Sequence, residues 1–160
     1  MENIHIEIDV KKASLDELSA DDRELVERAK AMTANSYSPY SRFSVGAAIR
    51  LADGTVYGGA NQENASFPVG SCAERSAFFF AQASQPDVPP VAIAIAAATN
   101  GHFTAAPVTP CGMCRQALLE AETRYGQPIR ILLFGAEATY VVNSFKDLLP
   151  LTFDGSELEC

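Results

Sequence analysis

Apolar and polar residues alternate over the first ten positions of the chain. Isoleucine or valine occupies every even position from 4 to 10, and polar residues occupy the odd positions from 3 to 9. This period of two is typical of a strand with one buried face. We therefore predict an extra N-terminal strand over residues 3–10, which ends at the two lysines in positions 11 and 12.

A helical period follows this alternation. Ser19 is of a residue type that caps helices, and acidic Asp22 comes three residues later. The apolar residues that share one face of the predicted helix are Leu25, Ala29 and Met32. We expect this helix to run to about Ser36, because Pro39 and its neighbours form a loop.

The remainder of the chain alternates between strand and helix patterns. The Asp-Gly pair at 53–54 predicts a hairpin turn, and the continuous apolar run at 91–98 predicts a strand that is covered on both faces. The elements that we expect, in order, are strands 43–52 and 55–60, helix 73–84, strand 91–98, helix 111–125, strands 129–134 and 139–142, and a short helix 145–149. This order predicts an α/β fold, a three-layer α/β/α sandwich with a mixed five-stranded sheet.

Composition and charge limit what such a domain does. The chain has 160 residues and a mass of 17.1 kDa, which is the size of one domain. Its 12 basic and 20 acidic residues give a net charge of −8, so a nucleic acid partner is not expected. The longest apolar run is too short to cross a membrane, and the acidic start does not have the pattern of a signal peptide. We expect no membrane partner and a cytoplasmic location.

The cysteines are the strongest chemical signal. Cys111 and Cys114 lie three residues apart at the start of a predicted helix, so both sulfurs face the same side of its first turn. Cys72 opens another predicted helix, and the positive end of each helix dipole favours the thiolate. Three thiolates leave the fourth tetrahedral position of Zn²⁺ for water, which is the arrangement of a catalytic zinc site. The zinc-bound water would then become hydroxide near neutral pH.

Glu74 is the candidate proton carrier beside that metal. It follows Cys72 by two residues, and residues at this spacing point to opposite sides of a regular helix. The hypothesis therefore requires Cys72 to occupy the non-helical cap while Glu74 lies in the first turn. Arg75 would offset the net −1 charge of one Zn²⁺ with three thiolates.

Other interpretations of the cysteines stay open at this point. The pair at 111 and 114 alone is also typical of thiol-disulfide redox motifs and of structural zinc sites. A closed four-cysteine zinc site with Cys160 would give a non-enzymatic protein with no water to activate. Since chain ends usually fray, we expect Cys160 to be a free surface thiol.

Four segments together resemble the small, homotetrameric cytidine deaminases. They are SPYSRFSVGAA at 38–48, NQENA at 61–65, CAER at 72–75 and PCGMCRQ at 110–116. Zinc deaminases of this kind combine a cysteine-containing ligand set with a glutamate that does not bind the metal. The resemblance implies a catalytic domain over 21–160 that follows an N-terminal extension over 1–20.

The resemblance also implies a reaction. Cytidine or deoxycytidine would be hydrolysed to uridine or deoxyuridine plus ammonia in pyrimidine salvage, with one zinc per subunit. Zinc-bound hydroxide would attack C4 while Glu74 carries protons to N3 and to the departing amine. The residues that would contact the substrate are Asn61 and Glu63 at the ribose 3′-hydroxyl, Phe43 on the base, the Ala73 N–H at O2 and the Thr109 carbonyl at the amino group.

Further implications concern the surroundings of the site. Arg75 and Gln116 resemble the groups that donate hydrogen bonds to the thiolates, and Phe153 resembles a side chain that enters a neighbouring subunit's site. A homotetramer with shared active sites is therefore expected. Phe67 and Gln62 depart from the family pattern, so a deaminase for another aminated nucleoside, such as a nucleoside antibiotic, is the alternative.

Overall fold

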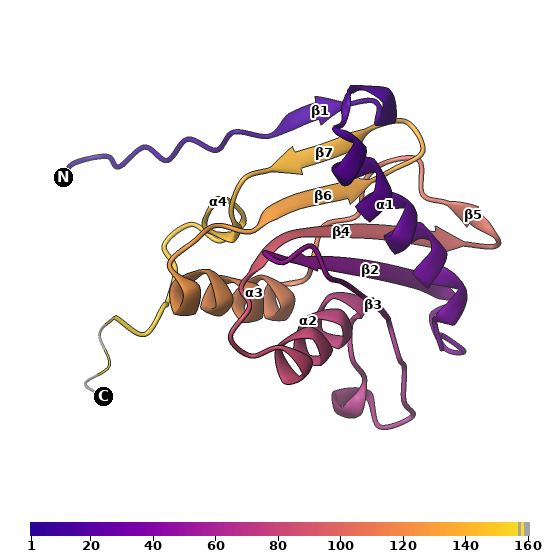
Figure 1. Cartoon of the computed structure of the whole chain (residues 1–160). Coiled ribbons are helices and arrows are strands. Elements are labelled where there is room, and N and C mark those ends of the chain that lie inside the picture. The colour runs from indigo at the N-terminus through magenta and orange to yellow at the C-terminus, as the bar shows by residue number, and fades with distance from the viewer. Residues whose placement is uncertain (157, 159–160) are drawn as a thin grey trace.

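The computed structural model describes residues 1–156 and 158, and its described strands form one mixed sheet (Figure 1). The strand order is β1-β7-β6-β4-β2-β3, and β5 pairs with β4. The strands are β1 (Lys11–Ala13), β2 (Phe43–Leu51), β3 (Val56–Ala60), β4 (Pro90–Thr99), β5 (His102–Phe103), β6 (Arg130–Phe134) and β7 (Thr139–Val142). The pairing of β4 with β6 is parallel, and the other pairings are antiparallel. The five predicted core strands are confirmed.

Helices cover both faces of this sheet and give the predicted three-layer sandwich (Figure 1). One face is covered by α1 (Ala20–Met32), whose buried side chains pack on alanines of β2 and β4. The other face is covered by α2 (Ala73–Ser84), α3 (Gly112–Tyr125) and the short α4 (Phe145–Leu148). None of the helices in the described ranges has the length and apolar character that crossing a membrane requires.

The central strand β4 shows why the apolar run in the sequence has no alternation. Ile93 and Ile95 are buried against α2 and α3, while Ala94 and Ala96 are buried against α1. Small residues on the α1 side let that helix lie close to the sheet. Gly46 on β2 is one point of close approach, because any Cβ there would collide with the backbone carbonyl of Ala29.

An extra N-terminal strand is present at the edge of the sheet, as predicted, but its predicted range of residues 3–10 is wrong. The strand β1 begins at Lys11, where Lys11 pairs with Val141 of β7, and residues 1–10 lie outside any strand. The four apolar side chains of residues 3–10 are exposed, and Ile4 is 84% exposed. The segment before Lys11 has no strand to pair with because β7 is short. Lys11 already pairs with Val141, and β7 ends one residue later at Val142. The segment runs away from the body of the molecule in line with β1 (Figure 1).

Most other predicted boundaries lie within two residues of the observed ones. The helix predicted to run to Ser36 consists of α1 and a 3₁₀ turn at Thr33–Asn35, and Ser36 caps that turn. The short strand β5 was missed, since only two residues form it in a segment that we expected to be a loop. The proposed division into residues 1–20 and 21–160 stays a prediction.

Candidate metal centre and the adjoining cavity

Three cysteines from two helix starts meet at one point. Cys72 is the N-cap of α2 and Cys111 is the N-cap of α3, both with extended backbone angles, and Cys114 lies in the first turn of α3. The Cys111 sulfur lies 3.7 Å from that of Cys72 and 3.6 Å from that of Cys114. All three sulfurs lie within 4.8 Å of one another.

These separations fit a tetrahedral zinc ion. Zinc-thiolate bonds of about 2.3 Å at tetrahedral angles place two sulfurs about 3.8 Å apart. The separations of the Cys111 sulfur from the other two agree with that edge to within a few tenths of an ångström. The donor set therefore fits Zn²⁺, as the sequence indicated, and it offers three sulfurs from the described residues.

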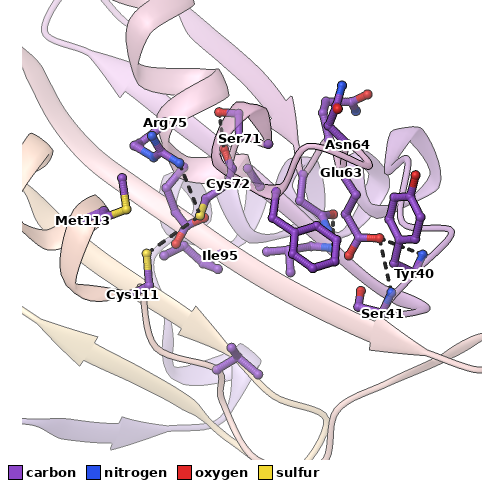
Figure 2. A pocket seen from close by; sticks show the side chains of 18 of the residues that line it. Tyr40, Ser41, Glu63, Asn64, Ser71, Cys72, Arg75, Ile95, Cys111 and Met113 are labelled. Atoms are coloured by element: carbon purple, nitrogen blue, oxygen red, sulfur yellow. Dashed lines mark hydrogen bonds between the residues drawn. The ribbon is translucent and has the colours of Figure 1, made fainter.

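The charges around the sulfurs favour thiolate at Cys72. Its pKa is lowered to about 5, chiefly because the Cys114 thiol donates a hydrogen bond to it and also because Arg75 lies beside it. The Arg75 guanidinium is 3.9 Å from the Cys72 sulfur (Figure 2). The pKa of Cys114 is raised by the same hydrogen bond and by burial, so without metal the proton stays on Cys114. Arg75 thus stands where the sequence placed a compensating cation.

Glu74 meets the geometric condition that we set from the sequence. It lies in the first turn of α2, directly after the non-helical cap that Cys72 forms, and it is only 5% exposed. Burial raises the pKa of its carboxyl group, and the negative charge of Cys72 raises it further. A buried carboxyl with a raised pKa beside a metal site is typical of a group that accepts and returns a proton.

A cavity of about 860 Å³ adjoins the sulfurs, and Figure 2 shows the side chains along it. One end is lined by Cys72, Cys111 and Glu74. The other end is lined by Glu63, from the irregular segment between β3 and α2, and by Tyr40, from the loop before β2. The cavity thus extends from the cysteine sulfurs at one end to exposed polar and aromatic side chains at the other.

Glu63 is held by the backbone opposite. One of its carboxylate oxygens accepts hydrogen bonds from the Tyr40 N–H at 2.9 Å and the Ser41 N–H at 3.2 Å (Figure 2). Hydrogen bonding with the Ser41 side chain lowers its pKa most, and these backbone bonds lower it further. An ionised carboxylate with a fixed position is suited to accept a hydrogen bond from a hydroxyl group.

Asn61 orders the loops at this end of the cavity. Its carbonyl oxygen accepts bonds from the Val45 N–H at 2.7 Å and the Ser36 hydroxyl at 2.6 Å. Its amide nitrogen donates to the Phe43 carbonyl at 2.9 Å. One side chain therefore joins β2, the end of β3 and the turn after α1, and the role that we predicted for it toward the sugar stays a prediction.

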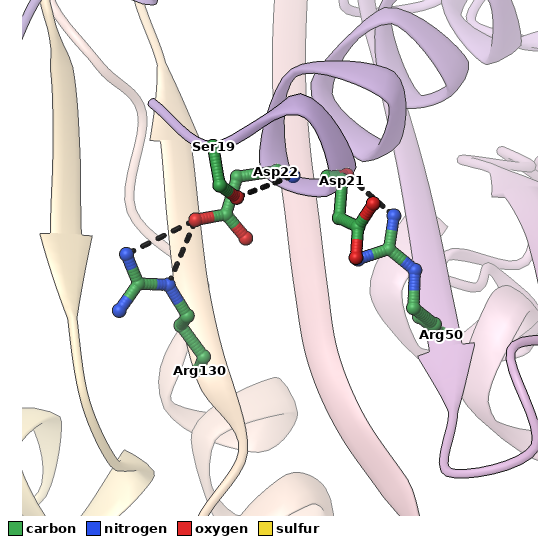
Figure 3. Close-up of polar contacts among 5 residues, drawn as sticks. All are labelled: Ser19, Asp21, Asp22, Arg50 and Arg130. Atoms are coloured by element: carbon green, nitrogen blue, oxygen red, sulfur yellow. Dashed lines mark hydrogen bonds and ion pairs between the residues drawn. The ribbon is translucent and has the colours of Figure 1, made fainter. Parts of the chain in front are cut away.

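The helix that leads to Ser36 is anchored at its other end (Figure 3). Ser19 caps α1 by accepting a bond from the Asp22 N–H, and the buried Asp22 carboxylate pairs with Arg130 of β6 at 3.0 Å. Arg50 of β2 donates to the backbone carbonyl of Asp21. The start of α1 is thereby fixed to two strands, which fixes the direction of the segment that reaches Asn61.

The remaining predicted site residues are placed as follows. Ala73 and Thr109 line the cavity, whereas Phe43 lies outside the residues that line it. Gln116 donates to the backbone carbonyl of Phe153 at 2.8 Å, and its expected bond to the thiolates stays a prediction. The Phe153 side chain is 62% exposed and is not part of the cavity wall of its own chain.

Two features of the site were missed. Tyr40 and Phe67 pack edge to face at the cavity wall, with ring centroids 5.9 Å apart. Arg115 donates to the carbonyls of Pro110 at 2.9 Å and Leu148 at 2.6 Å, and to the Thr109 hydroxyl at 3.3 Å. Arg115 follows Cys114 directly, so its place beside the metal ligands was a signal in the sequence that we did not use.

The closed four-cysteine zinc site would need Cys160 as its fourth ligand. Cys160 lies outside the described residues, so this interpretation stays untested.

Comparisons with known proteins help to decide between an enzyme and a structural zinc protein. The family model described as the cytidine and deoxycytidylate deaminase zinc-binding region matches residues 19–125. That match includes all three clustered cysteines, so the zinc assignment is confirmed at the level of the family.

Individual relatives agree with this match. A cytidine deaminase of Halalkalibacterium halodurans is 47% identical over 97 residues, which are 60% of this chain and 68% of that protein. A cytidine deaminase of Mycobacterium tuberculosis H37Rv is 37% identical over 133 residues, 81% of this chain and 87% of that protein. The crystal structure of cytidine deaminase from Burkholderia pseudomallei superposes with a TM-score of 0.70 at 39% identity, covering 81% of this chain and 97% of that one. The chain belongs to the cytidine and deoxycytidylate deaminase family of zinc-binding enzymes.

Proposed function

We propose that this chain hydrolyses cytidine or deoxycytidine to uridine or deoxyuridine and ammonia. The observation that carries the proposal is the meeting of three sulfurs at tetrahedral separations with the buried Glu74 at one end of a cavity. Water adds to C4 of the ring, the bond from C4 to the exocyclic nitrogen breaks, and ammonia leaves. The relatives named cytidine deaminase support this choice of reaction.

Zn²⁺ held by Cys72, Cys111 and Cys114 supplies the Lewis acidity that makes water a nucleophile near neutral pH. Glu74 takes the proton from the attacking water and passes it to ring N3. It then takes the second proton of the added water from the new hydroxyl at C4 and delivers it to the departing amine, so that the carboxylate ends in its starting state. The raised pKa of Glu74 supports this role, because an acid-base group works best when its pKa lies near the working pH.

Residues along the cavity orient the nucleoside in this proposal. Glu63 and Asn61 hold the ribose 3′-hydroxyl, the Ala73 N–H at the free N-terminus of α2 donates to O2, and the Thr109 carbonyl accepts from the amino group. Among the described residues that line the cavity, Arg75 is the one cation, and its guanidinium faces Cys72. Since no lining cation is free to bind a phosphate, the cavity favours a nucleoside over a nucleotide.

Another aminated nucleoside is the alternative substrate. Phe67 is exposed at the cavity wall and has no hydroxyl to contact the 5′ end of a sugar, and Gln62 lies between the two proposed ribose ligands. Rates on cytidine, deoxycytidine and a series of modified cytosine nucleosides would separate the two candidates. A preference for a modified nucleoside by more than about tenfold in kcat/KM would favour the alternative.

We also propose a homotetramer with shared active sites. Phe153 is exposed and lies outside the cavity wall of its own chain, which supports a role in a neighbouring subunit's site. Zinc thiolates require reduced cysteines, which supports pyrimidine salvage in the cytoplasm as the setting. A sedimentation experiment that finds a fully active particle of one chain would contradict the tetramer.

Glu74→Gln tests the proposed function most sharply. We expect the variant to keep its zinc and to lose turnover by several orders of magnitude, because the amide carries no proton between water and ring. Zinc content and the loss of ultraviolet absorbance with cytidine are the two measurements. Cys160→Ala is the control and should leave both unchanged. Near-normal turnover of Glu74→Gln would overturn the mechanism, and loss of zinc in Cys160→Ala would favour the closed four-cysteine site.

A further inference from the structure

The N-terminal segment of residues 3–10 leads into the edge strand β1 and has no neighbouring strand in the described part of its own chain. It continues from β1, whose last pairing partner toward the N-terminus is Val141, and runs clear of the molecule (Figure 1). Its apolar residues Ile4, Ile6, Ile8 and Val10 are all exposed. An exposed apolar strand edge is a template for pairing with another chain.

In an extended conformation, the apolar and the polar side chains of this segment lie on opposite sides. In β1, Ala13 packs on the α1 side of the sheet, so the neighbouring Lys12 belongs to the other side. If the chain continues this alternation, the four even-numbered apolar residues share the side of Lys12. The odd positions then carry Asn3, His5, Glu7 and Asp9 on the opposite side.

We propose that this segment pairs with the same segment of a second copy of the chain, as an antiparallel two-stranded ribbon about a twofold axis at Ile6. In this register the positions of two facing residues sum to 12. Ile6 faces Ile6, Ile4 faces Ile8, and Val10 at the end of the ribbon faces Glu2. On the other side His5 faces Glu7, and Asn3 faces Asp9.

Charge complementarity selects this arrangement. An imidazole N–H of His5 then faces the Glu7 carboxylate twice, and the amide of Asn3 faces the Asp9 carboxylate twice. A parallel pairing in register would stack Glu7 on Glu7 and Asp9 on Asp9, and like charges on facing positions are destabilising.

The antiparallel registers with sums of 14, 13 and 11 are less favourable. A shift of the sum to 14 places Glu7 opposite Glu7. A shift to 13 or 11 places each isoleucine opposite a polar residue, which breaks up the apolar side. The ribbon ends where Lys11 and Lys12 pair with β7 of their own chain, and edge lysines limit further growth of a sheet.

Single cysteines test the register. Only position 6 faces itself, so we expect Ile6→Cys to form a disulfide between copies about tenfold faster than Ile4→Cys or Ile8→Cys under mild oxidation. A mixture of Ile4→Cys and Ile8→Cys should form the mixed disulfide. Mass spectrometry of the cross-linked peptides separates these products from links to native cysteines. Equal rates at the three positions, or links only to native cysteines, would overturn the proposal.

Exchanging the residues at positions 5 and 7 tests whether His5 faces Glu7, with Ile6→Cys as the only introduced cysteine. In the Ile6→Cys background, His5→Glu places a second carboxylate opposite Glu7, and we expect cross-linking to fall about fivefold. Adding Glu7→His should restore the rate, since the pair is then reversed. A double variant as slow as the single one would contradict the register. Zinc content and turnover should stay unchanged in all these variants, because residues 3–10 are not among those that line the cavity. The cross-linking test can therefore fail while the proposed function holds, and the reverse.

Discussion

The two ends of the cavity are built on different kinds of structure. The sulfur end is built on two helix starts that pack on the sheet, where Cys114 and Glu74 are buried. The other end is built on the loop before β2 and on the irregular segment between β3 and α2, where Tyr40 of the loop and Phe67 of the segment are more than half exposed. The comparison indicates that the chemistry depends on rigid helix caps, whereas recognition depends on loops held by single side chains such as Asn61.

The largest effect is expected at the sulfur end. Cys111→Ser replaces an exposed thiol with a residue that is itself a good helix N-cap, so α3 should still begin at Gly112. Because two sulfurs hold zinc far less tightly than three, we expect loss of zinc and of measurable turnover. Metal analysis and an activity assay measure these losses, and far-ultraviolet circular dichroism controls for folding. Retention of both zinc and turnover would show that Cys111 is not a ligand.

A smaller effect, confined to the substrate, is expected at the loop end. Glu63→Gln keeps an oxygen that accepts the Tyr40 and Ser41 N–H bonds but removes the charge. A hydrogen bond to a charged group contributes about 1.5–3 kcal/mol, so kcat/KM for cytidine should fall about 10- to 100-fold. Zinc content should not change. The same assay with free cytosine, which has no ribose, is the matched control, and an equal loss there would mean that Glu63 does not act on the sugar.

The smallest effect is expected at Arg115, which joins the segment before Cys111 to the end of α4. Arg115→Lys keeps the charge but cannot make three fixed bonds, so we expect kcat to fall about tenfold and the free energy of unfolding to fall by about 1–2 kcal/mol. Arg124→Lys is the matched control, since Arg124 lies at the far end of α3 and donates to Pro86. An unchanged kcat with lower stability would limit Arg115 to a structural role.

The sulfur end could be predicted from the sequence because helix caps are local. Cys72 and Glu74 needed only the start of one helix to fall between positions 72 and 73, and that start is observed. The ends of the core strands followed from apolar runs and turn residues in the same way.

The features that were missed depend on distant parts of the chain. Whether residues 3–10 form a strand depends on where β7 ends, and β7 lies more than 120 residues later. The packing of Tyr40 on Phe67 and the bond from Arg115 to Leu148 likewise join segments that no local pattern relates. Phe43 belongs to a motif of the family, yet its place relative to the cavity wall is set by the register of β2.

The central claim is that three sulfurs leave one coordination position of the metal free for water. X-ray absorption at the zinc edge of the loaded, full-length protein tests it directly, because sulfur and oxygen neighbours lie at different distances. We expect three sulfurs at about 2.3 Å and one lighter neighbour at about 2.0 Å. A fit that requires four sulfurs would contradict the account, since no position would then remain beside Glu74 for water.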